Sequence, residues 1–270
     1  MPERLGRALL WGVGVLLIAF LVAPIAIVVL TSLNPSPYMD FPPKQISLHW
    51  YANFFASPHW TDPAWLSLRV ALAVSVLSTV LGTLAAVGIV RGQFLGRQAL
   101  EIFLISPMVV PVVVLALGLF FLFSATHLLN RWPALVLGHT VAATPIVVIL
   151  VRAGLRTVDP AMELAARSLG ANLPRALWHV TLPSIRQSTA AAAVFSFLIS
   201  FDEVVVAVFV GGPDATTLPK RMWESIRFEI DPTLTAISSL LTALVVVVLL
   251  AAEAARRLGA GRTREASGPR

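Results

Sequence analysis

Two adjacent carboxylates, Asp202 and Glu203, lie in the middle of the apolar stretch SFLISFDEVVVAVFVGG, residues 196–212. An uncompensated charge at membrane depth costs at least about 2.5–3.5 kcal/mol, so such acids are expected to face something polar. Two kinds of chemistry fit the pair. The acids could form ion pairs with bases such as Arg69 or Arg131, or with a partner subunit. They could instead line the path of a cationic solute, as carboxylate rings do in cation pores.

No catalytic set accompanies these acids, and we expect no enzyme, metal or cofactor on this chain. It has no Cys, which excludes disulfides, Cys-ligated zinc and a thiol nucleophile. No G-x-x-x-x-G-K-[ST] pattern occurs, so ATP is expected to bind elsewhere. Ser196 and Ser200, one helical turn apart, are expected to hydrogen-bond to their own helix. The five histidines have no metal-binding spacing; they are His49, His59, His127, His139 and His179.

The composition predicts an all-α integral membrane protein. Hydrophobic residues make up 57% of the 270 residues and charged residues 13%, against roughly 25% charged in soluble domains. The mean hydropathy is +0.83. Six apolar runs approach or exceed the roughly 20 residues of a spanning helix: 8–33, 65–90, 102–124, 134–152, 189–210 and 233–253.

The first apolar run favours a retained transmembrane helix over a secretory signal peptide. It follows the basic start MPERLGR and is about 25 residues long, whereas the core of a signal peptide has only about 7–15. We expect three regions: an anchor helix with the first outer loop (1–60), a core transmembrane domain (61–255) and a basic cytoplasmic tail (256–270).

The distribution of basic residues predicts the orientation. Of the 20 Lys and Arg residues, 14 fall in the two termini and the loops 91–101 and 152–188, which therefore lie on the cytoplasmic side. Six spans place both termini there, in a multi-pass membrane protein. The pI near 10.9 does not indicate nucleic-acid binding, because the bases are split among loops and the partner they indicate is the lipid bilayer.

The long cytoplasmic loop carries the start and stop signals of a short helix. Asp159 fits the N-cap, Pro160 the first helical position and Gly170 the position after the end. Glu163 and Arg167 stand in the favourable i, i+4 order on one flank. Small and apolar residues at helical spacing form what we call the α-stripe: Ala161, Leu164, Ala165, Ser168 and Leu169.

A second short helix is expected to begin at Asn172 and Pro174 and to end at Leu182–Pro183. Helices this short are marginal alone, so the α-stripe is expected to pack on the chain's own spans or on a partner. A solvated loop lying on the membrane is the alternative.

The loop resembles the cytoplasmic EAA loop of permease subunits of ATP-binding-cassette (ABC) importers. That pattern is E-A-A, three residues, G, nine residues, and I-x-L-P. Aligned on Gly170, the chain differs at the first position, because Leu164 replaces the glutamate and the acid is one residue earlier, at Glu163. The matched positions are Ala165, Ala166, Gly170, Leu182 and Pro183, with Val180 in place of the isoleucine.

This resemblance implies the type I ABC importer permease fold, with a coupling helix between the fourth and fifth spans that seats in a groove of the ATPase subunit. Two ATPase subunits would bind ATP and Mg. A second permease subunit, which we expect to be non-identical although a homodimer stays open, and a periplasmic substrate-binding protein would complete the assembly. The coupling positions would be Glu163, Leu164, Ala165, Ala166, Gly170, Leu182 and Pro183.

A second resemblance concerns the substrate. The patterns S-F-D-E-V-V-V-A-x-F-V-x-G-G-P, T-L-P and W-E-S-I-R-x-x-I-D-P resemble the fifth and sixth spans of polyamine (spermidine/putrescine-type) ABC permeases. The resemblance implies that Asp202 and Glu203 lie at the translocation path. A polyamine cation needs carboxylates to offset its desolvation on leaving water.

The outer loop 211–232 would then meet the substrate-binding protein. Its mixed charges suit a polar, transient docking face, although a solvated amphipathic loop is the alternative. The charged residues are Lys220, Arg221, Arg227, Asp214, Glu224, Glu229 and Asp231.

Other functions stay open at this point. Related permeases carry opines, phosphonates, thiamine or ferric iron. A proton- or ion-coupled secondary carrier would use the two acids as a relay, and a channel or structural membrane subunit would need no ATPase. The cytoplasmic loop argues against the carrier and the channel.

Overall fold

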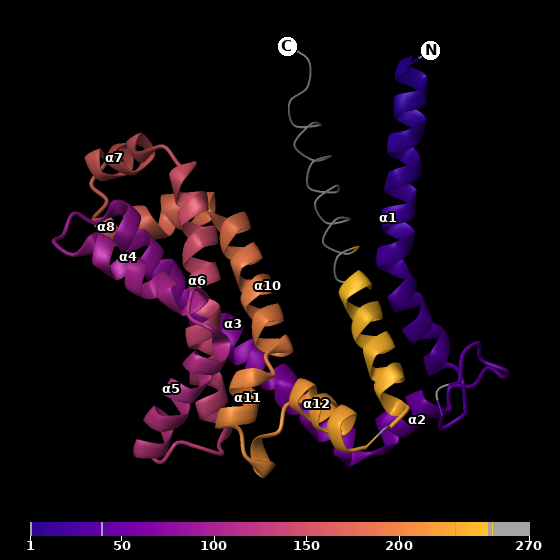
Figure 1. The fold of residues 1–270 in the computed structure, drawn as a ribbon. Coiled ribbons are helices and arrows are strands. Elements are labelled where there is room, and N and C mark those ends of the chain that lie inside the picture. The colour runs from indigo at the N-terminus through magenta and orange to yellow at the C-terminus, as the bar shows by residue number, and fades with distance from the viewer. Residues whose placement is uncertain (1, 39, 230, 248–249, 251–270) are drawn as a thin grey trace. The chain divides into compact units, whose positions relative to one another are not determined.

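The computed structural model describes residues 2–38, 40–229, 231–247 and 250, and every regular element among them is a helix (Figure 1). Helices satisfy all their backbone hydrogen bonds within one segment, as a membrane-spanning chain requires. The chain divides into two compact units. One holds the residues up to Thr61 together with those from Ser225 onward, and the other is Asp62–Glu224.

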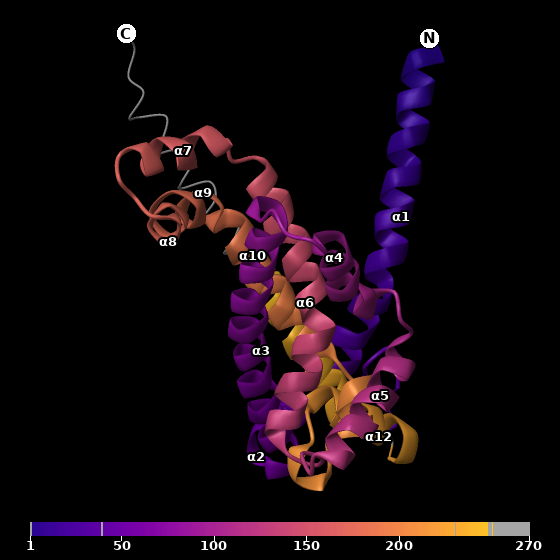
Figure 2. The ribbon, with the colours of Figure 1, turned by 90° about the vertical axis from the view of Figure 1, so that its left-hand side faces the viewer.

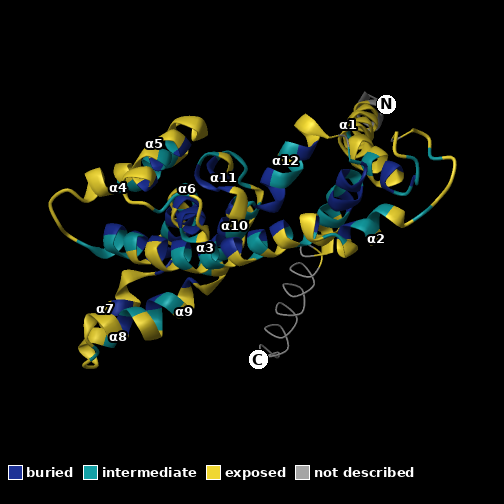
Figure 3. Ribbon diagram, turned by 90° about the horizontal axis from the view of Figure 1, so that it is seen from below, coloured by how far each residue is buried: buried dark blue, intermediate teal, exposed yellow. Residues whose placement is uncertain are grey.

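The first unit contains α1 (Pro2–Ser32), α2 (His49–Ala56) and a helix over Thr233–Val247. The most apolar part of α1 buries none of its residues, and most of the helix is exposed in Figure 3. A helix that is apolar all round is expected to be surrounded by lipid or by other helices. This element agrees with the predicted first span at 8–33.

Polar side chains tie the ends of these helices together. The Ser32 and Tyr51 hydroxyls lie 2.7 Å apart, and the indole N–H of Trp50 donates to the Asn34 carbonyl at 2.8 Å. Asn53 donates to the Thr233 hydroxyl at 2.8 Å. Residues 248–249 and 251–253 of the predicted sixth run, and the predicted basic tail at 256–270, lie outside the described residues.

The second unit is built around α6 (Trp132–Arg156), which packs against α3 (Pro58–Arg91) and α10 (Arg186–Asp202), as two views show (Figures 1 and 2). Glycines allow these helices to approach closely, as is common in membrane bundles. A Cβ at Gly82 would collide with Val147, and one at Gly154 would collide with Ser188.

The predicted span 102–124 is not one straight helix. It is divided into α4 (Arg97–Ile105), the 3₁₀ turn η1 (Ser106–Met108) and α5 (Val112–Ala125), and the two arms meet at 104°. Pro111 precedes α5 and lies outside helical geometry, with ψ at 129°. A break is expected here, because proline lacks an N–H and disfavours helical geometry in the residue before it.

Three helices are long and apolar enough to cross a membrane, α1, α3 and α6, or four if the bent pair crosses as one span. This count rests on length and composition within the described residues. The predicted run 189–210 is also interrupted, since α10 ends at Asp202 and α11 (Val205–Val210) begins three residues later. The number of six spans therefore stays a prediction.

Candidate functional site

The first part of the site is the cytoplasmic loop, whose predicted helix is α7 (Pro160–Ser168). The Asp159 carboxylate accepts the Ala161 N–H at 2.9 Å, which caps the first turn, and Pro160 occupies the first helical position. Gly170 has a φ of +93°, in the left-handed region that favours glycine after a helix. The start and stop signals in the sequence are confirmed here.

The second helix of the loop differs from its prediction. It starts as α8 (Leu173–Ala176), where the Asn172 side chain accepts the Arg175 N–H at 3.0 Å. It then continues through a π turn, η2 (Leu177–Thr181), into α9 (Leu182–Ser184), and it ends at Ser184, one residue after the predicted end at Leu182–Pro183.

The π turn gives a physical reason for this continuation. The N–H of Leu182 donates to the carbonyl of Leu177, five residues earlier. Pro183 has no N–H to complete an ordinary α-helical turn, and the wider turn just before it shifts the hydrogen-bond pattern by one residue. The helix therefore includes the proline and ends one residue after it, at Ser184.

The α-stripe of α7 is exposed along its whole length. Leu164 is 59% exposed and Leu169 90% exposed, and the other three members are exposed as well (Figure 3). Packing on the chain's own spans, one of the two expected outcomes, does not occur in the part of the chain that the structure describes. A surface with two exposed leucines is therefore open to a partner.

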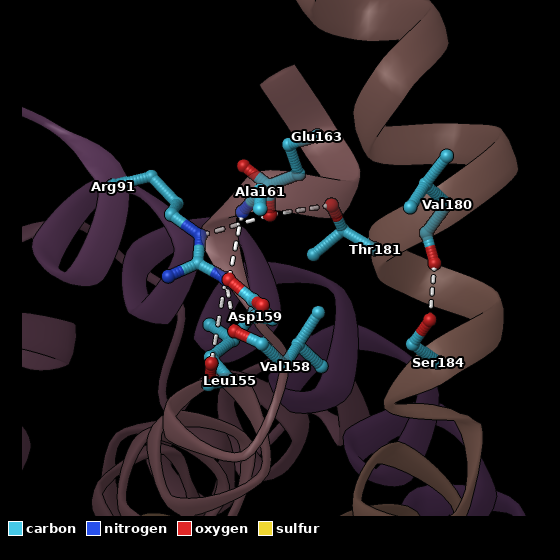
Figure 4. A network of polar contacts seen from close by, with 9 residues as sticks. All are labelled: Arg91, Leu155, Val158, Asp159, Ala161, Glu163, Val180, Thr181 and Ser184. Carbon is cyan, nitrogen blue, oxygen red and sulfur yellow. Dashed lines mark hydrogen bonds and ion pairs between the residues drawn. The ribbon is translucent and has the colours of Figure 1, made fainter. Parts of the chain in front are cut away.

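Glu163 lies on the opposite, inner side of α7 and is only 8% exposed (Figure 4). Its Oε1 atom lies 2.9 Å from Nε of Arg91 and accepts the Thr181 hydroxyl at 2.8 Å. The favourable spacing with Arg167 does not produce an ion pair, because Glu163 turns to Arg91 instead. The displaced acid of the EAA pattern thus has a partner within this chain.

Arg91 joins three segments of the chain. It ends α3, and its Nη2 atom donates to the carbonyls of Leu155 and Val158 at 3.4 and 3.2 Å (Figure 4). These carbonyls lie at and just beyond the C-terminal end of α6, where a positive charge is favoured by the helix dipole. Arg91 and Glu163 therefore hold α7 against the ends of α3 and α6.

The second part of the site is the helix break at the two acids. α10 ends at Asp202, Glu203 has extended backbone with ψ at 111°, and α11 begins at Val205. The Glu203 carboxylate accepts the Val206 N–H at 3.0 Å. The expectation of one continuous span is wrong here, since Glu203 supplies a partner for a backbone N–H that the break leaves free.

The two acids therefore differ in what they contact. Glu203 is half-buried and caps α11, whereas Asp202 is exposed. Across the described ranges, neither acid forms an ion pair with Arg69, Arg131 or any other base. Pairing of these acids with a base is thus not observed among the residues that the structure describes.

Two adjacent residues of α6 contact the two sides of this break. A Cβ at Gly138 would lie 2.9 Å from Val206 of α11. The Nδ1 atom of His139 lies 3.1 Å from the carbonyl oxygen and 3.0 Å from the hydroxyl of Ser200, on α10. The expectation for Ser196 is confirmed, since it bonds to Ala193 of its own helix, but Ser200 reaches a neighbouring helix.

In the outer loop, one residue that was expected on the docking face, Lys220, is buried. Lys220, in α12 (Leu218–Phe228), is only 7% exposed, and its Nζ atom donates to the Gly211 carbonyl at 2.6 Å. Burial lowers the pKa of the Lys220 ammonium, although nearby Glu224 acts in the opposite direction. Lys220 therefore links two parts of the outer loop by a buried hydrogen bond and does not contribute to an exposed face.

With this geometry in place, comparison with known proteins identifies the family. Residues 78–264 match the family described as binding-protein-dependent transport system inner membrane component. The chain belongs to this family. The match includes both the cytoplasmic loop and the acid-bearing break, and it makes the chain a transport component and not an enzyme.

Similar proteins agree with this assignment. The putrescine transport system permease protein PotI of Escherichia coli K12 is 32% identical over 247 residues, which cover 88% of each chain. The spermidine/putrescine transport system permease protein PotC of the same strain is 29% identical over 249 residues, 92% of this chain and 94% of that one. The predicted family is confirmed.

Solved structures share the fold of this permease. A chain of a bacterial ABC transporter that imports the acidic polysaccharide alginate has a TM-score of 0.76 at 13% identity, covering 95% of this chain and 97% of that one. A chain of the MetNI methionine ABC transporter has a TM-score of 0.60 at 18% identity, covering 73% and 93%. The all-helical importer permease fold is confirmed.

Sequence reasoning missed Arg91, Thr181 and His139 in this permease. Arg91 was counted only as a basic residue that sets orientation, and His139 only as a histidine without metal spacing. A signal for His139 was present, because an ionisable residue within an apolar run, here 134–152, marks a functional position by default.

The Arg91–Glu163 pair predicts a specific stability change. Glu163→Gln removes the carboxylate that neutralises Arg91, and breaking a buried pair costs up to about 3–5 kcal/mol. We expect the detergent-solubilised permease to unfold at a lower temperature in a thermal melt. Arg167→Gln, at the exposed residue one turn away, is the matched control and should melt like the wild type. Equal melting temperatures for both variants would contradict the assigned role of the pair.

Proposed function

We propose that this permease forms half of the path by which an ATP-driven importer moves a polyamine cation, such as spermidine or putrescine, across the inner membrane. The observation that carries the proposal is Asp202, an exposed carboxylate at a helix break with no ion-pair partner in the described chain. The relatives named for putrescine and spermidine transport support the class of substrate.

The chemistry of the break suits such a cation. A polyamine loses hydration when it enters a narrow path, and a carboxylate replaces part of that hydration by a charge-assisted hydrogen bond. Asp202 has its charge available, whereas Glu203 already accepts a backbone N–H. Asp202 is therefore the acid we assign to direct contact with the solute, with Glu203 shaping the break beside it.

The exposed α-stripe is the surface that we assign to a cytoplasmic ATPase subunit. Leu164 and Ala165 would enter its groove, and Gly170 lets the chain turn sharply after the helix. A displacement of α7 would be passed on through Glu163 to Arg91, because that ion pair is the connection between α7 and the ends of α3 and α6. ATP and Mg would bind to the two ATPase subunits.

The rest of the assembly follows from the same proposal. A second, non-identical permease would supply the other half of the path, and a periplasmic substrate-binding protein would dock on the outer loop, with Asp214 and the Arg221–Glu224 pair on the face it meets. Both chain termini would then lie in the cytoplasm. The ligand of that binding protein selects the solute.

Coupling can be tested on the α-stripe. Ala165→Arg places a charged, bulky side chain on the exposed face without touching a buried residue, and Gly170→Pro removes the left-handed turn. We expect both variants to insert normally but to hydrolyse ATP without uptake, measured as the ratio of ATP hydrolysed to spermidine imported in proteoliposomes. Arg167→Gln serves as a control off the stripe. Normal ratios in both variants would reject docking at this face.

The acids can be tested separately. Asp202→Asn keeps the shape of the side chain and removes its charge, so we expect uptake of spermidine to fall about tenfold, equivalent to about 1.4 kcal/mol in the barrier. Asp62→Asn, at an exposed acid of α3, is the matched control and should transport normally. Unaltered spermidine uptake by the Asp202→Asn, Glu203→Gln double variant would refute the role of the acids while leaving the coupling result intact.

A further inference from the structure

We propose that His139 is a positioning residue for transport: it caps the end of α10 from the neighbouring helix and so fixes where Asp202 is presented. The proposal rests on the function proposed above for the acids. It concerns a residue that contacts neither acid directly, and it assigns a purpose to a fully buried imidazole inside a membrane-spanning helix.

The first argument is the hydrogen-bond accounting of the break. In an unbroken helix the Ser200 carbonyl would accept the N–H of Val204, four residues later. Because α10 ends at Asp202, the carbonyl of Ser200 is among the last four of the helix, which have no partner within it. His139 Nδ1 lies 3.1 Å from this carbonyl oxygen.

We assign His139 the tautomer with the hydrogen on Nδ1. A carbonyl oxygen only accepts, so the contact with the Ser200 carbonyl is a hydrogen bond in this tautomer, whereas in the other one the Ser200 hydroxyl would donate to Nδ1. The same N–H lies 3.0 Å from the Ser200 hydroxyl, so both polar groups of Ser200 meet one donor. His139 therefore provides a hydrogen-bond partner for a carbonyl at the end of α10, as Glu203 does for an N–H at the start of α11. The break thus has one side-chain cap on each side.

The second argument is the unused ring nitrogen. Nε2 of His139 is buried and has no hydrogen-bond partner within the described residues. An unpaired buried polar atom is destabilising, and an apolar side chain of similar size would avoid that penalty. Packing alone thus gives no reason for an imidazole here, whereas the Nδ1 bond to Ser200 does.

The third argument is position. Ser200 lies two residues before Asp202, so holding the carbonyl of Ser200 fixes the last turn of the helix that carries the acid. Gly138, which directly precedes His139 in α6, packs against Val206 of α11. One turn of α6 thus contacts both arms of the break. Without the His139 bond, α10 would be free to extend through Glu203 and Val204, which would re-aim Glu203 and change the surroundings of Asp202.

The position of the break can be measured without transport. The chain has no cysteine, so Asp202→Cys introduces its only thiol. In the assembled importer in membrane vesicles, the rate of labelling by a charged methanethiosulfonate reagent is read on this subunit by mass spectrometry. We expect His139→Leu to change that rate severalfold. His139→Asn, which keeps a donor near the Nδ1 position, should restore it.

A neighbouring buried residue provides the control. The Thr140 hydroxyl donates to the Val136 carbonyl of its own helix, so Thr140→Val removes a buried hydrogen bond of α6 without touching α10. Its labelling rate should match that of the parent. Equal rates for His139→Leu and the parent would overturn the inference, whatever the transport result.

Spermidine uptake then tests whether His139 acts through Asp202. His139→Leu should lower the maximal uptake rate in the wild-type background but cause little further loss when combined with Asp202→Asn. The effects of two substitutions do not add when one residue acts through the other. Fully additive losses would overturn the inference. If Asp202→Asn alone transports normally, the proposed role of the acid fails, and the labelling rate still decides whether His139 holds the break.

Discussion

The ion pair between Arg91 and Glu163 is the contact on which the geometry of the cytoplasmic loop depends. It brings together the end of α3, the end of α6 and the inner side of α7 through one guanidinium and one carboxylate. Both groups are mostly withdrawn from water, so removing either one would leave the charge of the other buried and unpaired. With Glu163 committed inward, the opposite side of the short helix, the α-stripe, is presented outward.

At the helix break beside Asp202 and Glu203, as at the Arg91–Glu163 pair, polar groups withdrawn from water need hydrogen-bond partners. A helix interrupted in an apolar environment leaves backbone donors and acceptors without partners. At this break the Glu203 carboxylate accepts the Val206 N–H, and His139 Nδ1 lies 3.1 Å from the Ser200 carbonyl oxygen, so each new helix end has one side-chain partner. Asp202 is exposed and has no ion-pair partner among the described residues, and this difference from Glu203 is the reason why we propose Asp202 as the acid that meets the solute.

Helix α6 contacts both the cytoplasmic loop and the helix break at the two acids. Its C-terminal carbonyl at Leu155 is bound by Arg91, and His139, sixteen residues earlier, holds the break. At 1.5 Å per residue these points are about 24 Å apart along one helix. Under the proposed function, a rigid element of this kind is what would let movement of the cytoplasmic loop reach the acids.

Local signals in the sequence predicted the local structure well. The caps at Asp159 and Asn172 and the turn at Gly170 depend on neighbouring residues only, and the structure has them. The family was recognisable for the same reason, because the loop pattern is short and fixed in spacing. The long apolar runs at α1, α3 and α6 were predicted from composition alone.

The contacts that shape the candidate site join residues far apart in sequence, and these contacts were missed. Arg91 and Glu163 are 72 residues apart, and His139 and Ser200 are 61 apart, so no periodic pattern connects them. Glu163 illustrates the difference: i, i+4 spacing favoured Arg167, but a partner from another helix offered a more buried, charge-assisted bond. The interruption near Pro111 had a signal in Pro107 and Pro111 that the predicted run 102–124 did not use, whereas the break at Glu203 was marked only by the two acids.

The most direct test of the central claim, that α7 presents its α-stripe to an ATPase subunit, is cross-linking from Ala165→Cys in the assembled importer. The chain has no other thiol, so a thiol-to-amine reagent bound at this position reports its immediate neighbour. The account predicts cross-links to the ATPase subunit and protection of the thiol when that subunit is present. Free labelling at the same rate with and without the ATPase subunit would contradict it.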